Sequence, residues 1–297
     1  MNLPIQLSVR EKDSGGPIAP AVAVGPPGSQ LDGNDHVLIL VHGFDDSFND
    51  AADCYKMFLD DLSADFPTYI GQIAEFYWPG DSPLKIISTL SYPNQIAPAI
   101  ESAHRLSAYL WTLKGARNGP MEMSFVGHSL GCRVVLELLA LWTGGMPPSI
   151  RLATVVLMAA AVLVKHVDQG GQLRAAATLS DDELVLSSRG DPVLHWAFPL
   201  GETVAREGFF PTAVGRFGGP QQTWKASLPM FDSGKPYTHG SYWPGNESAN
   251  AVATALGGAP PRMLATAGIS ENTRAPENSV ASRETPIRNL PAQPAFA

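Results

Sequence analysis

Cysteine is scarce in this chain of 297 residues, which contains two of them, Cys54 and Cys132. They form neither a Cys-x-x-Cys pair nor a zinc-ligand spacing, and each falls in a segment with helical apolar periodicity. This scarcity excludes a disulfide-stapled scaffold and a cysteine-based zinc site, and it predicts two buried thiols. The sequence indicates no metal ion and no other cofactor.

Long apolar runs and blocks of basic residues are also missing. The longest apolar stretch, residues 153–164, is shorter than the roughly 20 residues that cross a bilayer as a helix, so we expect no membrane span. The first residues lack a basic segment followed by an apolar core, and we therefore expect a cytoplasmic protein. The 20 basic and 28 acidic side chains give a net charge of −8, which argues against nucleic acid or anionic lipid as a partner.

Glycine and proline are plentiful near both ends of the chain and divide it into three parts. Residues 1–35 hold one apolar strand, 3–9, and a Gly/Pro-rich leader that we expect to be mostly loop. Residues 36–257 carry regular apolar patterning and form the predicted main domain. Residues 258–297 contain six prolines and a single aromatic residue, Phe296, which predicts an extended or disordered tail, or one that wraps the domain or a partner.

Strands and helices alternate through the main domain. Apolar runs without period-2 alternation are typical of parallel strands covered on both faces, and they occur at 36–41, 73–78, 121–126, 154–162 and 183–188, with a strand-like run at 223–230. Helical periodicity occurs between a Ser47/Asp50 capping box and Pro67, at 98–113 with Pro98 in the first turn, at 130–142 and from Asn246. The alternation predicts an α/β fold with a mostly parallel central sheet and helices on both faces.

One motif joins a strand directly to a helix. Gly127-His128-Ser129-Leu130-Gly131 fits the G-x-S-x-G pattern and lies between the strand at 121–126 and the helix at 130–142, as a nucleophile elbow requires. The glycines permit a tight turn that exposes Ser129, which is the expected nucleophile. Ser129 sits at a helix N-terminus, where unpaired amides favour negative charge, so the Leu130 amide is the expected oxyanion donor.

A second oxyanion donor is expected from the loop after an earlier strand. His42-Gly43-Phe44 follows the first buried strand, and the Phe44 amide is our candidate. We interpret the His42 side chain as one that organises the turn, while the backbone of the loop does the chemistry.

The position of each histidine relative to the strand ends selects a general base. Ligands bind outside the carboxyl ends of strands in open α/β sheets, which disfavours His36, before its strand, and His104, inside a helix. The elbow turn aims His128 away from the serine, His166 precedes every late candidate acid, and His195 falls in a segment that we expect to be a packed helix. His239 remains, in a loop rich in glycine and aromatic residues between the run at 223–230 and the helix from Asn246.

The acid that would orient His239 is best matched by Asp191, which follows the strand at 183–188. Asp168 is a rival because it also follows a strand end, and Asp45 or Asp46 beside the oxyanion loop stays open. An alternative role for Asp191 is a helix cap before Pro192. The chain order Ser129, Asp191, His239 is that of nucleophile, acid and base in α/β hydrolases.

Several stretches between about residues 36 and 255 resemble the α/β-hydrolase superfamily, and within it a poorly characterised bacterial family. The G-x-S-x-G motif is the sharply diagnostic one. The other stretches are Val41-His42-Gly43-Phe44, Phe76-Tyr77-Trp78-Pro79, Ser188-Arg189-Gly190-Asp191-Pro192 and Thr238-His239-Gly240-Ser241-Tyr242. The resemblance implies an α/β-hydrolase catalytic domain at 36–257, a triad and oxyanion hole on the residues chosen above, and no cofactor.

The expected activity is that of a carboxylesterase-like serine hydrolase, which cleaves a small acyl ester through an acyl-enzyme on Ser129. Trp78, Tyr92 and His128, together with Phe44, are candidates for lining an acyl pocket, with ordinary core packing as the alternative for each. Residues 80–95 and 199–220 could form a wall or lid. Two other functions stay open, an acyltransferase that uses the same triad and a ligand-binding module that keeps the fold without turnover. The sequence specifies no oligomeric state.

Overall fold

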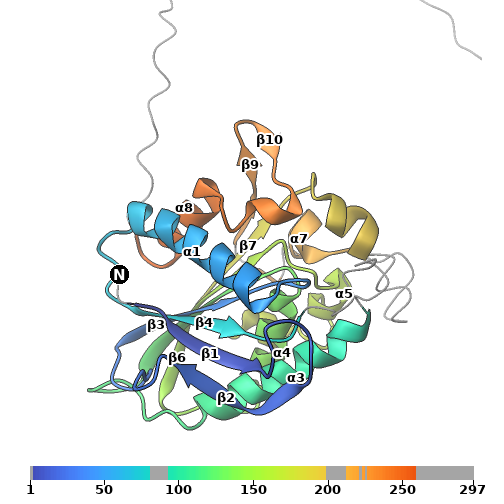
Figure 1. The fold of residues 1–297 in the computed structure, drawn as a ribbon. Helices are drawn as coiled ribbons and strands as arrows, with labels where there is room; N and C mark the ends of the chain where they lie inside the picture. The colour runs from blue at the N-terminus through green and yellow to red at the C-terminus, as the bar shows by residue number, and fades with distance from the viewer. Residues whose placement is uncertain (1–2, 81–92, 199–211, 221–222, 225, 259–297) are drawn as a thin grey trace, which may run out of the picture. The chain divides into compact units, whose positions relative to one another are not determined.

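The computed structural model describes residues 3–80, 93–198, 212–220, 223–224 and 226–258 (Figure 1). These residues belong to one compact unit that ends at Pro261. Within them, the main sheet has eight strands in the order β2-β1-β4-β3-β5-β6-β7-β8. The strands are β1 Ile5–Arg10, β2 Ile18–Gly25, β3 His36–Val41, β4 Gln72–Tyr77, β5 Met121–His128, β6 Ile150–Met158, β7 Asp182–Ser187 and β8 Ala226–Pro229.

The sheet is parallel except at one edge. Only β2 runs antiparallel to its neighbour β1, while β1 pairs in parallel with β4 and all pairs from β4 to β8 are parallel. The carboxyl ends of β3, β5, β6 and β7 therefore meet at one edge of the sheet. After β3 the chain first moves to β4 on one side and then returns to β5 on the other, so a topological switch point lies between β3 and β5.

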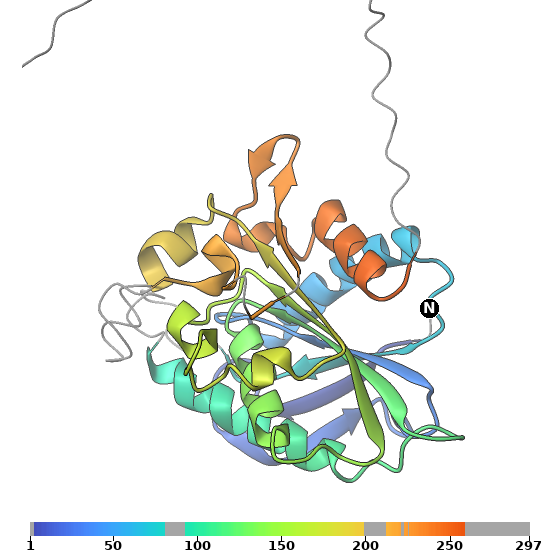
Figure 2. The same ribbon diagram turned by 180° about the vertical axis from the view of Figure 1, so that it is seen from behind.

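Helices cover both faces of the sheet, as the alternation of elements predicts. Helix α3 (Pro93–Leu110) packs against α4 (Gly131–Trp142), and α1 (Phe48–Asp65) packs against α8 (Asn246–Ala255). Figures 1 and 2 show these two pairs on opposite sides of the strands. Shorter helical segments are α5 (Val164–Val167), η1 (Ala176–Thr178), η2 (Val193–Ala197), α7 (Val214–Phe217) and η3 (His239–Ser241).

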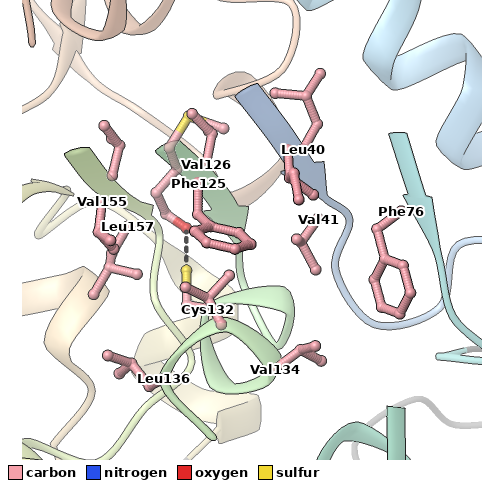
Figure 3. Close-up of a cluster of buried hydrophobic side chains, with 14 of the residues drawn as sticks. Leu40, Val41, Phe76, Phe125, Val126, Cys132, Val134, Leu136, Val155 and Leu157 are labelled. Atoms are coloured by element: carbon pink, nitrogen blue, oxygen red, sulfur yellow. Dashed lines mark hydrogen bonds between the residues drawn. The ribbon is translucent and has the colours of Figure 1, made fainter. Parts of the chain in front are cut away.

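The core forms where α4 lies under the central strands. Figure 3 shows Cys132, Val134 and Leu136 of this helix facing apolar side chains from β3, β4, β5 and β6. Cys132 is buried and its thiol donates to the Met158 carbonyl oxygen at 3.4 Å, so it is a packed thiol of the kind that the sequence predicts. The close packing of α4 thus holds β3 and β5, the strands on either side of the switch point, in fixed positions.

Several boundaries differ from those expected, and three of the differences have a clear physical reason. The leader contains a strand, β2, because Pro20 is tolerated on an edge strand that has a free side. Helix α3 begins at Pro93 and places Pro98 in its interior, since only one of the two prolines can occupy the first helical position. Strand β6 ends at Met158, because Ala159 turns the chain with a positive φ of 46°.

A small hairpin, β9 (Phe231–Asp232) and β10 (Lys235–Pro236), extends from the body of the unit (Figures 1 and 2). It joins β8 to η3.

In the part of the chain that the structure describes, no helix combines the length and the apolar character needed to cross a membrane.

Tyr55 of α1 ties together the carboxyl ends of β3 and β4. Its hydroxyl accepts the His42 amide at 2.7 Å and donates to the Phe76 carbonyl oxygen at 2.8 Å. The side chain is fully buried, so these backbone groups have no access to water.

We therefore expect Tyr55→Phe to destabilise the fold by about 1–3 kcal/mol, because a buried amide and a buried carbonyl lose their partner while the ring is kept. Urea denaturation measures the change. Tyr109→Phe is the matched control, since the half-buried Tyr109 hydroxyl makes no hydrogen bond within the described residues, and it should change stability by less than about 0.5 kcal/mol. Equal effects of the two variants would contradict the role given to Tyr55.

Candidate active site

Ser129 occupies a strained turn between β5 and α4. Its φ is +52°, a left-handed conformation that non-glycine residues seldom adopt. Two hydrogen bonds to the end of β6 hold the turn, from the Ser129 amide to the Met158 carbonyl oxygen (2.9 Å) and from the Ala161 amide to the Ser129 carbonyl oxygen (3.0 Å). The strain is therefore compensated by a neighbouring strand, and the serine side chain is fixed in one direction.

Two glycines allow this turn to form. A Cβ atom on Gly131 would lie 2.3 Å from the carbonyl oxygen of His42 and 2.4 Å from that of Val41, and one on Gly127 would lie 3.0 Å from Cα of Cys132. No side chain fits at the first of these contacts. The first turn of α4 thus rests directly on the backbone at the end of β3.

Ser129, His239 and Asp191 form a continuous chain of hydrogen bonds. Oγ of Ser129 lies 2.8 Å from Nε2 of His239, and Nδ1 of His239 lies 2.7 Å from Oδ2 of Asp191. Asp191 is fully buried, whereas the side chain of His239 is 17% exposed. Residues from three distant parts of the sequence are brought together in the arrangement of nucleophile, base and acid.

Asp191 is both a helix cap and the partner of His239. Its Oδ1 accepts the amides of Val193 (2.9 Å) and Leu194 (3.0 Å), while Oδ2 faces the imidazole. The two roles that the sequence left as alternatives therefore coexist on the two oxygens of one carboxylate. The cap locks the rotamer and directs Oδ2 at the ring.

A further bond joins the acid loop to the histidine loop. Oγ of Ser188 donates to the Tyr237 carbonyl oxygen at 2.6 Å and accepts the Gly190 amide at 3.2 Å. The sequence did not point to Ser188 or to Tyr55, because each acts on the backbone of a segment that only the tertiary structure brings near.

The rival acids lie elsewhere. Asp168 is exposed at the end of α5, and its Oδ1 accepts the Gln169 amide at 2.8 Å. Asp46 faces His42 instead, with 3.7 Å between Oδ2 and Nδ1. Within the described residues, Asp191 is the carboxylate at ion-pair distance from His239.

His42 organises the loop after β3 from inside the core. Nε2 accepts the Trp78 amide at 3.2 Å, so the proton is on Nδ1, which donates to the Gly43 carbonyl oxygen at 2.9 Å. The Trp78 indole in turn donates to the His42 carbonyl oxygen at 2.9 Å. Complete burial, with a smaller contribution from the charge of Arg10, lowers the pKa of His42 to about 3 and keeps the ring neutral.

The loop after β3 lies against Ser129. A Cβ atom on Gly43 would lie 3.0 Å from Cβ of Ser129, so Phe44 begins immediately beside the elbow. Within the described residues, the Leu130 amide donates no hydrogen bond at the start of α4. An oxyanion that forms at Ser129 would therefore meet an available amide at a helix N-terminus.

His128 supports His239 from below. Its Nε2 lies 2.9 Å from the His239 carbonyl oxygen, and because a carbonyl only accepts, this nitrogen carries the proton. Burial, with a smaller contribution from the charge of His239, lowers the pKa of His128 to about 3. His128 is thus a neutral residue that ties the elbow to the histidine loop.

Two predicted lining residues are packed in the core. Trp78 is fully buried and stacks on the His42 ring at 5.7 Å between centroids, and His128 is 6% exposed. For both, the structure fits the alternative of ordinary packing, because the Trp78 indole nitrogen and Nε2 of His128 bond to backbone groups of the site. Phe44 is half-buried, whereas Tyr92 and most of the segments 80–95 and 199–220 lie outside the described residues.

No group of three or more metal-ligating side chains occurs in the part of the chain that the structure describes.

The comparison with known protein families agrees with this architecture. A family model described as "Alpha/beta hydrolase of unknown function (DUF900)" matches residues 29–216. Solved structures with a similar fold include a presumed hydrolase of Agrobacterium vitis S4 (13% identity, TM-score 0.45, 76% of this chain and 91% of that chain). Two others are acyl-protein thioesterase 2 of Zea mays (13%, 0.40, 78% and 96%) and carboxyl esterase 2 of Tuber melanosporum (12%, 0.35, 78% and 75%). No curated protein sequence matches the chain.

The buried neutral histidines make stability depend on pH. Because the pKa values of His42 and His128 are lowered from 6.5 to about 3, the unfolded chain takes up protons that the folded chain cannot. The contribution of the two neutral rings to the free energy of unfolding should be fully present above about pH 6.5. Below that pH it should fall by roughly 1.4 kcal/mol per pH unit for each ring. Asp46, whose pKa burial raises to about 6, offsets part of this loss because it gains a proton in the folded state.

Urea midpoints at pH 7, 6 and 5 measure this dependence, and His128→Phe should make it shallower by removing one titrating ring. His104→Phe, at an exposed position of α3, should leave the slope unchanged. A midpoint that is the same at pH 5 and pH 7 would contradict the neutral state of the two rings.

Proposed function

Because the chain belongs to the DUF900 family of α/β hydrolases, we propose that it is a serine hydrolase that cleaves acyl esters in the manner of a carboxylesterase. The observation that carries the proposal is the unbroken sequence of contacts from Ser129 Oγ to His239 (2.8 Å) and from His239 to Asp191 (2.7 Å). Such an array converts a weak hydroxyl nucleophile into an effective one.

In the first half-reaction, Ser129 Oγ attacks the ester carbonyl carbon as His239 Nε2 takes the hydroxyl proton. The carbonyl oxygen becomes an oxyanion, which the amides of Leu130 and Phe44 stabilise. The tetrahedral intermediate then collapses, the C–O bond to the alcohol breaks, and His239 returns its proton to the leaving oxygen. The acyl group stays on Ser129 as an ester.

In the second half-reaction, water replaces the alcohol. His239 takes a proton from the water as its oxygen attacks the acyl carbon, and the second tetrahedral intermediate releases the carboxylic acid. His239 then protonates Ser129 Oγ, which restores the starting state.

The surroundings of Asp191 favour this sequence of proton transfers. With Oδ1 occupied by two amides, Oδ2 is the acceptor that holds the proton of His239 on Nδ1 and leaves Nε2 free to accept from the serine. A buried carboxylate also stabilises the imidazolium that forms during attack. His128 keeps the backbone of His239 in place while the ring changes charge.

The test is covalent labelling followed by turnover. A fluorophosphonate probe should label the protein and should fail to label Ser129→Ala, and p-nitrophenyl acetate should be hydrolysed only by the protein that labels. Absence of labelling in the unaltered protein would overturn the proposal in favour of a binding module. Release of the acyl group to an added alcohol rather than to water would favour an acyltransferase.

Asp191→Asn should lower turnover by about 10⁴-fold, by analogy with other triads, because the amide favours the wrong tautomer of the histidine. Asparagine can still cap the turn at Val193 and Leu194, so the variant tests chemistry rather than folding. Asp168→Asn is the matched control, and its turnover should equal that of the unaltered protein. A comparable loss in Asp168→Asn would show that the acid is assigned wrongly.

A further inference from the structure

Two arginines share one exposed aromatic ring beside the acid loop. The guanidinium carbon of Arg216 lies 4.7 Å from the centroid of the Phe217 ring, and that of Arg189 lies 5.7 Å from it. We call these three residues the arginine rim. A contact between one cation and an exposed ring contributes about 0.5–1 kcal/mol, but two cations on the same ring also repel each other.

Neither arginine has a counter-charge among the residues that the structure describes. Within the described residues, Arg189 and Arg216 form no ion pair and their side chains donate no hydrogen bond, although the chain carries 28 acidic side chains and a net charge of −8. By contrast, Arg151 of β6 and Arg105 of α3 each pair with carboxylates. Nε of Arg216 is moreover buried and has no acceptor among the described residues, an arrangement that costs free energy.

A short ladder of backbone hydrogen bonds connects the arginine rim to the nucleophile. The Ala161 amide donates to the Ser129 carbonyl oxygen (3.0 Å) and the Gly215 amide to the Ala160 carbonyl oxygen (2.9 Å). The Ser188 amide then donates to the Gly215 carbonyl oxygen at 2.9 Å. Arg216 follows Gly215 and Arg189 follows Ser188, so the backbone of both arginines is held at the same edge of the sheet as Ser129.

Exposed apolar side chains occur on the segments next to the arginine rim. Phe217 is 48% exposed, and the segment η2, which contacts α7, presents Val193 and Trp196 at 40% and 63% exposure. This segment follows Asp191 directly. The surface therefore combines positive charge with aromatic and aliphatic area, which suits a ligand that has both an anionic group and an apolar part.

We propose that the arginine rim is a substrate subsite for the anionic group, a carboxylate or a phosphate, of a small acyl ester whose reacting carbonyl lies at Ser129. This inference rests on the proposed function for the position of the ester, but the anion site itself rests on the two unpaired arginines. The guanidinium groups bind the oxygens of the anion, and Phe217 and Trp196 contact the apolar part of the same molecule.

Two p-nitrophenyl esters of equal length test the preference. The butyrate is neutral, and the hemisuccinate carries a carboxylate at the end of the same four-carbon acyl chain. The unaltered protein should have the higher kcat/KM for the hemisuccinate, and the double variant Arg189→Gln/Arg216→Gln should lose about 10- to 100-fold of that preference. Arg189→Lys/Arg216→Lys should retain part of it, whereas Arg151→Gln, which removes a cation that is paired elsewhere, should leave it intact.

A binding measurement separates this subsite from the proposed function. Phenyl phosphate should bind to Ser129→Ala in a calorimetric titration. The triple variant Ser129→Ala/Arg189→Gln/Arg216→Gln should bind it at least about 10-fold more weakly. Binding without turnover of any ester would support the anion site while the hydrolase proposal fails. Hydrolysis with equal kcat/KM for the two esters, and no effect of the arginine variants, would overturn the anion site while the hydrolase proposal stands.

Sedimentation with lipid vesicles tests the alternative that the arginine rim binds a lipid surface. The unaltered protein should not sediment with phosphatidylglycerol vesicles more than with phosphatidylcholine vesicles. Sedimentation that is specific for phosphatidylglycerol and lost in the double arginine variant, with no preference between the soluble esters, would overturn the substrate subsite in favour of a lipid surface.

Discussion

The close approach of two stretches of backbone underlies the whole site. The first turn of α4 rests on the carbonyl groups at the end of β3, at a distance that leaves no room for a Cβ atom on Gly131. This contact joins the elbow that carries Ser129 to the loop that carries Gly43 and Phe44. If it opened, the serine and the loop amides would move apart, and the amides could no longer meet charge that develops at the serine.

The polar groups around this contact are satisfied almost entirely by backbone. His42, Tyr55 and Ser188 each bond to main-chain atoms of a segment distant in sequence, and Asp191 uses one of its oxygens to accept the amides that directly follow it. Such bonds fix loops without adding charge. They leave His42 and His128 neutral, since burial lowers the pKa of each ring and their hydrogen bonds are to uncharged backbone groups.

Charge is distributed unevenly over the molecule. The chain as a whole is acidic, yet the edge of the sheet next to Asp191 carries two arginines with no carboxylate partner in the described residues. Net charge alone argues against an anionic partner of any large size, whereas the local arrangement suits a small anion. The net charge does not determine the electrostatic potential at a local site, because fields from distant side chains are screened within about 10 Å.

The elements that depend on local pattern were predictable from sequence. The apolar runs locate β3, β4, β5 and β7, the Ser47/Asp50 pair marks the start of α1, and the two glycines around Ser129 mark the elbow. These features are encoded by neighbours within a few residues. The edge strand β2 escaped detection because its pattern is weak and its proline is tolerated only at an edge.

Tertiary structure decided which side chains meet. Asp168 and Asp191 both follow strand ends, and only the fold places Asp191 against His239 and leaves Asp168 exposed. Likewise, nothing local to Trp78 or His128 distinguishes a pocket wall from a buried support. The physical reason is that contact between residues 48 or 110 positions apart depends on how loops cross the edge of the sheet. That crossing is set by packing summed over the whole sheet, and no short segment of sequence contains it.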